Sequence, residues 1–158
     1  MPLIIAFCFL VVGGVALQAR AARQARDTIR KHHLDDIEHA LYKARDAHGT
    51  FPPYDQATWC GFLNDPKNQS TKTEVEQALR QYNQMYANQA KPFPTDPKPG
   101  WDYFYWKRSP AVFELYANLE QAPTKERNSN SCPTAPPRYF DYGITSIWRE
   151  TGASSPAL

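Results

Sequence analysis

Histidines and carboxylates are the first candidates for chemistry in this chain, because they could bind a metal or exchange protons. Four histidines fall in one stretch: His32, His33, His39 and His48. On a helix His32 and His39 are seven residues apart while His33 points elsewhere, and no Cys or carboxylate completes a zinc spacing. Asp35 and Asp36 diverge around a helix, so they form no acid–base pair. We predict solvated histidines and no metal site.

The motifs of common enzyme classes and the charge of a nucleic-acid binder are both missing. The sequence contains no G-x-S-x-G, P-loop, G-x-G-x-x-G or H-E-x-x-H pattern. Its 18 Lys and Arg against 16 Asp and Glu give a net charge of only +2, which offers no electrostatic attraction for nucleic acid. We therefore predict no catalytic residue, no cofactor and no nucleic-acid partner.

Two cysteines, Cys60 and Cys132, lie outside the apolar N-terminal run that contains Cys8. In an oxidising compartment an even pair forms a disulfide readily. Closing so long a loop would stabilise the fold by about 4 kcal/mol in the chain-entropy model. Cys60 and Cys132 are therefore the disulfide candidate, and two unpaired buried thiols are the alternative.

An aromatic cluster is the remaining candidate for a binding site. It consists of Trp101, Tyr103, Phe104, Tyr105 and Trp106. Such rings can stack on sugars or on the bases of single-stranded nucleic acid. A strand alternates its side chains between two faces, so half of the set is expected to be core against a helix.

The N-terminal part of the chain must position these groups. Leu3 to Leu17 is an apolar run without a charged residue, and basic residues crowd between Arg20 and Lys31. The run is short for a membrane span and close in length to a signal-peptide core. If the run is a cleaved signal peptide, the basic n-region that normally precedes its apolar core is missing. If it is a retained anchor, the basic residues after it would place the head in the cytoplasm by the positive-inside rule. Both interpretations therefore meet an objection.

One continuous helix is expected from about Leu3 to Ala47. Between Gln18 and Ala47 no Gly or Pro interrupts the chain, and apolar residues recur every three to five positions. Gly49 and Pro52 end it. Its outer half is amphipathic, with charged residues expected on the wet side: Arg26, Arg30, Asp35, Asp36, Glu38, Lys43 and Arg45.

Shorter elements follow in the head. The capping-box spacing of Thr71 and Glu74 predicts a helix over 71–88. Residues 101–107 and 111–119 predict an antiparallel hairpin, 121–137 a long loop and 139–144 a third strand. The fold class is α+β: a long N-terminal helix packed on an antiparallel sheet of about three strands, with one additional short helix.

The order of these features resembles type IV pilin-like proteins, especially the major pseudopilin of type II secretion systems. The similarity covers most of the chain and lies in the following segments: Ala22-Arg23-Gln24-Ala25-Arg26-Asp27, Ile37 to Tyr42, Gly49-Thr50-Phe51-Pro52, Asp96-Pro97, Tyr103-Phe104-Tyr105, Phe113 to Glu120 and Tyr142 to Ser146. The basic leader ending in Gly, followed by Phe-Thr-Leu-Ile-Glu, is missing. Aligning Ala22 to Asp27 with the family helix predicts that the chain begins several residues inside that segment.

The resemblance implies four parts: a transmembrane half of the helix at 1–19, an amphipathic half at 20–48, a pilin-like head at 49–150 and a flexible tail at 151–158. It also implies a single-pass protein of the bacterial cytoplasmic membrane, with its head extracytoplasmic and in the periplasm or at the cell surface after assembly. The filament core would consist of apolar helix residues: Leu3, Ile4, Ile5, Phe7, Phe9, Leu10, Val11, Val12, Val15 and Leu17.

In this family the subunit is structural, and its partners are further pilin-like subunits and an inner-membrane assembly machinery. Charges from Arg20 to Lys31, with Asp27, Asp35, Asp36 and Glu38, would set the register between subunits. The calcium of the major pseudopilins is not expected here, because 121–132 contains Glu126 as its only acidic residue. The alternative function is a membrane-anchored extracytoplasmic binding protein whose aromatic head captures a ligand.

Overall fold

A computed structural model describes the backbone of residues 2–86, 92–121, 127–128, 132 and 139–146. Side chains are described from Leu17 onward within these ranges, except at 86, 127, 128 and 139. The predicted tail at 151–158 and most of the predicted loop at 121–137 lie outside the described residues.

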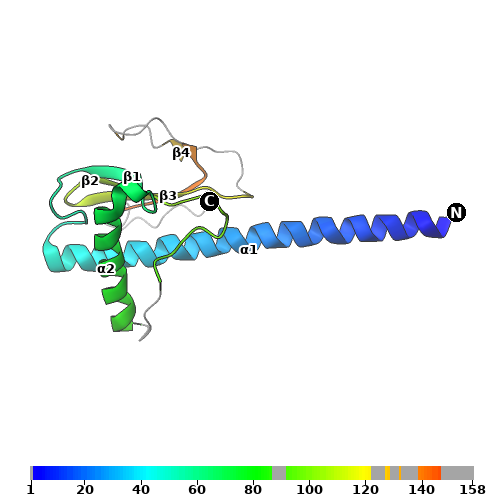
Figure 1. Cartoon of the computed structure of the whole chain (residues 1–158), viewed down its shortest axis with the longest axis horizontal. Helices are drawn as coiled ribbons and strands as arrows, with labels where there is room; N and C mark the ends of the chain where they lie inside the picture. Colours follow the sequence, from blue (N-terminus) through cyan, green and yellow to red (C-terminus); the bar gives the residue numbers. More distant parts are fainter. Residues whose placement is uncertain (1, 87–91, 122–126, 129–131, 133–138, 147–158) are drawn as a thin grey trace.

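A single long helix, α1, runs from Pro2 to His48 and confirms the predicted helix to within one residue at each end. Figure 1 shows its C-terminal part packed against the head and its N-terminal part projecting far beyond it. Gly49 ends the helix with a positive φ of 75°, and its N–H donates to the carbonyl of Arg45 at 2.7 Å. This is the left-handed glycine cap that the sequence predicts.

The head contains a four-stranded antiparallel sheet with the order β1-β2-β3-β6. Its strands are β1 (Trp59–Phe62), β2 (Phe104–Ser109), β3 (Val112–Ala117) and β6 (Tyr142–Thr145). The hairpin of β2 and β3 confirms the prediction. Strand β1 was not predicted, because four residues containing a glycine make too short a pattern to identify.

The third predicted strand, 139–144, is divided in two. Tyr139–Phe140 is β5, which pairs with β4 (Arg127–Asn128) in a separate small sheet, and β6 begins at Tyr142. Asp141 lies between them and accepts a hydrogen bond from the Leu119 N–H at 3.0 Å. The expectation of about three strands is therefore corrected to four in the main sheet.

The second helix, α2, spans Gln69–Tyr86 and follows a single 3₁₀ turn, η1 (Pro66–Asn68). It lies across α1 in Figure 1. The predicted capping box is wrong, because the helix begins two residues before Thr71. The Glu74 carboxylate instead accepts a hydrogen bond from the Tyr54 N–H at 2.9 Å, so that it holds the segment after α1 against α2.

Both faces of β2 are buried from Phe104 to Lys107, which corrects the expectation that only half of the aromatic cluster is core. Tyr103 and Tyr105 pack with Phe113 and with α1 residues such as Leu34. On the opposite face Phe104 and Trp106 pack with other buried residues: Tyr116, Cys132 and Phe140. The four rings from Tyr103 to Trp106 therefore lie inside the head, where they cannot form an exposed stacking platform.

The disulfide between Cys60 and Cys132 is present, as predicted. Its Cα atoms are 6.2 Å apart, and it links residues separated by 72 positions. Cys60 belongs to β1, while Cys132 is buried against Phe104 and Trp106. The bridge thus ties the segment between β4 and β5 to the face of the sheet that α1 does not cover.

Two predictions for α1 are wrong. Arg30 and Glu38 were expected on the wet side, yet both are buried, with 0% and 3% of their surface exposed. In addition, no helix within the described residues is long and apolar enough to cross a membrane, which contradicts the predicted single-pass protein of the cytoplasmic membrane with its transmembrane half at 1–19. The run from Leu3 to Leu17 has 15 residues, about two fewer than the shortest usual span, and polar residues follow it.

Candidate functional site: the stalk and its junction with the head

The part of α1 that projects from the head, residues 2–25, is called the stalk here. Every residue from Leu17 to Ala25 is exposed, and Leu17 exposes 70% of its surface. The first nine of the ten predicted filament-core positions are described only as helical backbone, and Leu17 is the tenth. The structure therefore places all ten on one helix that extends away from the head.

Arg30 fixes the stalk to the head at the point where α1 emerges. Its guanidinium group donates two hydrogen bonds to Asp96, from Nε at 2.8 Å and from Nη2 at 2.9 Å. Its Nη1 also donates to Asp27 at 2.6 Å and to Glu120 at 3.1 Å. A fully buried arginine is thus bound by three carboxylates from α1, the segment before β2 and the segment after β3.

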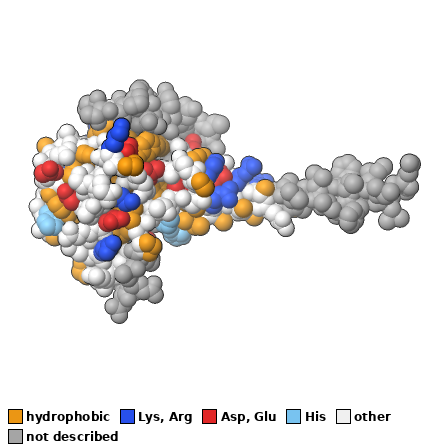
Figure 2. All heavy atoms as spheres, viewed as in Figure 1, with side chains coloured by type: hydrophobic (Ala, Val, Ile, Leu, Met, Phe, Trp, Pro, Cys, Tyr) orange, Lys and Arg blue, Asp and Glu red, His pale blue; other side chains and the backbone are white. Residues whose placement is uncertain are grey.

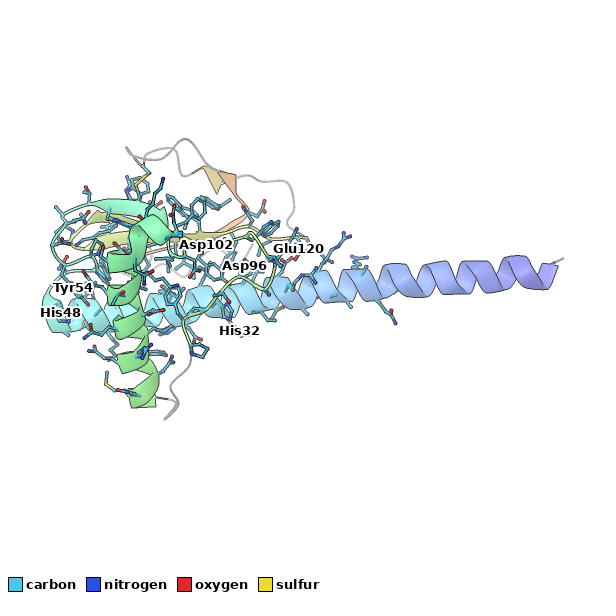
Figure 3. The ribbon with its side chains drawn as sticks, viewed as in Figure 1. His32, His48, Tyr54, Asp96, Asp102 and Glu120 are labelled. Atoms are coloured by element: carbon cyan, nitrogen blue, oxygen red, sulfur yellow. A yellow bond between two sulfur atoms is a disulfide. The ribbon has the colours of Figure 1, made fainter. Side chains whose placement is uncertain are left out.

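Arg26 completes this arrangement, one turn of α1 before Arg30. Its Nε and Nη2 donate to the two carboxylate oxygens of Glu120 at 2.7 and 2.8 Å. Paired hydrogen bonds of this kind fix both distance and orientation. The five residues Arg26, Asp27, Arg30, Asp96 and Glu120 are called the ion cluster below, and Figure 3 shows Asp96 and Glu120 beside α1.

Asp27 also binds the backbone of the head. One of its carboxylate oxygens accepts from the Glu120 N–H at 2.8 Å and the other from the Gln121 N–H at 2.9 Å. The Gln121 side chain in turn donates to the Arg20 carbonyl at 2.8 Å. The chain after β3 is therefore attached to α1 over two turns of helix.

Aromatic stacking supports the ion cluster from one side. The guanidinium carbon of Arg30 lies 4.6 Å from the centre of the Trp101 ring, and Lys98 Nζ lies 3.9 Å from it. Cations near the face of an indole ring are stabilised by its quadrupole. Trp101, which the sequence suggested as a ligand platform, thus packs on a buried cation of its own chain.

The electrostatics favour the charged forms of Glu120 and Arg30. Hydrogen bonds from Arg26 and then from Arg30 outweigh burial and lower the pKa of Glu120 to about 2. Burial alone would lower the pKa of Arg30, but the hydrogen bonds that it donates to Asp96, Asp27 and Glu120 outweigh burial and raise the pKa above its usual value. All three carboxylates are committed to donors, so the cluster provides neither a general base nor a nucleophile.

Two of the four histidines are bonded within the chain and two are exposed. His33 hydrogen-bonds through Nδ1 to the Tyr103 hydroxyl at 2.7 Å, and His39 bonds to the Asp35 carbonyl and stacks on Tyr82. His32 and His48 are exposed. Among the described residues no group of three or more His, Cys, Asp or Glu could hold a metal ion.

Sequence reasoning missed the ion cluster, although a local signal was present. Asp27 and Arg30 have the i, i+3 spacing of a helical ion pair. Their distant partners, Asp96 and Glu120, are 66 and 90 residues from Arg30, and no pattern in the sequence connects them. The prediction that Asp27 pairs with a neighbouring subunit is not supported by these contacts, because its carboxylate is occupied inside the chain.

Other charges of the predicted register segment remain at the surface. Arg20 and Arg23 are exposed on the stalk, and Figure 2 shows Lys and Arg side chains gathered where α1 leaves the head. Lys31 is exposed as well, with its Nζ 5.2 Å from the centre of the Tyr142 ring. The base of the stalk is therefore basic.

Comparisons with family models, curated proteins and solved structures found no match for this chain. The resemblance to pilin-like proteins rests on the order of sequence segments given above.

Proposed function

We propose that this protein is a structural, non-enzymatic subunit of a pilin-like filament, in which copies associate through their stalks. The observation that carries the proposal is the projection of α1 from the head with the apolar run Leu3 to Leu17 at its far end. A lone helix cannot bury its apolar residues against itself. Packing stalks side by side would remove this surface from water and stabilise the assembly.

The ion cluster supports the same function through rigidity. A filament needs every subunit to present its stalk at one angle to its head, because small angular differences accumulate along a helical array. Arg30 and Arg26 bind carboxylates from two separate segments of the head. Directional, bidentate contacts of this kind oppose bending at the junction.

Sedimentation velocity of the full chain tests the proposal. We expect the wild-type protein to form oligomers whose mass rises with concentration. Val12→Lys places a charge in the apolar run and should weaken association at least tenfold. Gln24→Lys adds the same charge at an exposed position nearer the head and serves as the matched control, expected to associate more strongly than Val12→Lys. A wild-type chain that remains monomeric at every concentration would contradict the proposal.

A further inference from the structure

A groove between α1, α2 and the segment 92–95 begins one helical turn beyond the stalk. Its volume is about 440 Å³. Three apolar residues line it: Ile29 exposes 41% of its surface, Phe93 is half-buried and Leu79 is buried. His32, which also lines the groove, lies on α1 between α2 and the stalk in Figure 3. The groove therefore offers an apolar wall to a helix that lies along the stalk.

An uncharged face of α1 leads from the stalk into this groove. Four exposed residues follow one another on this face at spacings of four, three and four positions: Gln18, Ala22, Ala25 and Ile29. At 3.6 residues per turn such spacings keep side chains on one side of a helix, and the stalk arginines fall on other sides. The two alanines allow a second helix to approach closely.

Asn83 points to an occupant for the groove that it lines. Only 2% of its surface is exposed, and its Nδ2 has no hydrogen-bond partner within the described part of the chain. Buried amide donors are almost always satisfied. The carbonyl oxygen of a helical residue keeps a second lone pair after it accepts its intrahelical bond. A docked helix therefore supplies the acceptor that Asn83 lacks.

The apolar run from Leu3 to Leu17 matches this surface in chemistry and in length. Its 15 residues extend over about 21 Å at 1.5 Å per residue. The face from Gln18 to the end of the groove wall at Asp36 is about 27 Å long. Because α1 is one continuous helix, the run of a chain cannot reach the groove of the same chain. The matching occupant is the run of a second copy.

We propose that the apolar run of one copy docks on the uncharged face and in the groove of a second copy. Its side chains pack against Ile29 and Phe93, and one of its carbonyl oxygens accepts a hydrogen bond from Asn83 Nδ2. This inference rests on the proposed filament function and assigns its contact to two different surfaces of the chain. Such a heterologous contact leaves a run and a groove open at the two ends of every assembly, so copies add without closing into a dimer.

Mixing two variants, each with one damaged surface, tests this contact by sedimentation velocity. Val12→Lys places a charge in the run and keeps the groove, whereas Ile29→Lys places a charge at the groove and keeps the run. Each variant alone should associate at least tenfold more weakly than the wild-type chain, because docking would bury the added charge. Their equimolar mixture should form a 1:1 dimer and nothing larger, because one intact run and one intact groove remain per pair.

The control and the outcomes separate this contact from filament assembly itself. Thr28→Lys adds the same charge at an exposed neighbouring position and should associate like the wild-type chain. A wild-type chain that stays monomeric contradicts both proposals. If the wild-type chain associates, then a mixture that stays monomeric, or an Ile29→Lys variant that associates normally, overturns the docking in the groove and leaves contacts between stalks.

NMR of the mixture locates the docked helix. When ¹⁵N-labelled Val12→Lys is titrated with unlabelled Ile29→Lys, the side-chain amide resonances of Asn83 should shift and saturate at one equivalent. Adding Asn83→Leu to the Val12→Lys chain removes the donor at nearly the same size and should weaken the dimer at least threefold. Gln84→Leu makes the same change at an exposed position of α2 and should leave the dimer unchanged. A dimer that forms without any change at Asn83 would overturn the proposal.

Discussion

At the scale of single residues, the arrangement depends most on Arg30. Its side chain is fully buried and hydrogen-bonded to three carboxylates, one from its own helix and two from the head. Replacing a buried ion pair by apolar residues is often neutral, but removing one partner leaves the others uncompensated. The energetic contribution of the cluster therefore appears mainly when it is broken.

The variant Arg30→Met should lower the free energy of unfolding by about 3–5 kcal/mol, because Asp96 and Glu120 lose a buried cation. Chemical denaturation of the disulfide-intact protein measures this change. Arg23→Met on the exposed stalk is the matched control, and its effect should stay within about 0.5 kcal/mol. Equal, small effects for the two variants would show that the cluster does not hold the junction.

Acidification should weaken the junction in a defined pH window. The pKa of Glu120 is lowered from 4.5 to about 2 in the folded chain. A lowered pKa means that its stabilising contribution is complete above about pH 4.5 and is lost as the pH falls toward 2.

Unfolding curves between pH 2 and 6 test this expectation. The wild-type protein should lose stability across the window, and Glu120→Gln should show a shallower dependence. A Glu120→Gln variant with the same slope as the wild-type chain would assign the acid sensitivity to other groups.

At the scale of elements, the two halves of α1 have different surroundings. Its C-terminal half supplies core residues such as Leu34, Ile37 and Leu41, and its N-terminal half projects from the head. Ala40 and Ala44 pack with Ala78 and Leu79 of α2, where small side chains let the two helices approach closely.

The local signals of the sequence predicted these elements well. The long helix, its glycine end and the β2–β3 hairpin depend on periodicity and on Gly49, which act over a few residues. Strand β1 and the burial of both faces of β2 depend instead on what packs over the sheet, which periodicity does not record. For the same reason the charged pattern of α1 predicted that Arg30 faces solvent. Arg30 is buried instead, because Asp96 and Glu120 from distant parts of the chain accept its hydrogen bonds.

The disulfide belongs to the same scale, because it joins β1 to the segment that covers the outer face of the sheet. Replacing both Cys60 and Cys132 by serine should lower the free energy of unfolding by about 4 kcal/mol, as expected for a loop of 72 residues. Thermal unfolding of the double variant and of the wild-type chain measures the loss. A difference below about 1 kcal/mol would contradict the entropic account.

At the scale of the whole molecule, the protein consists of a compact head and a stalk held in one direction (Figure 1). At the junction, the charged side chains of the ion cluster pair with one another inside the chain. The stalk is exposed from Leu17 to Ala25, and Lys and Arg side chains gather where it leaves the head. This arrangement fits the proposed filament subunit, in which the stalk contacts neighbouring subunits and the head forms the outer surface.

Electron microscopy of the concentrated full-length chain tests this assembly most directly. The account predicts filaments of constant diameter with a regular axial repeat, present for the wild-type protein and for Gln24→Lys but lost in Val12→Lys. Single dispersed particles, or amorphous clumps without a repeat in all three proteins, would contradict assembly through the stalk.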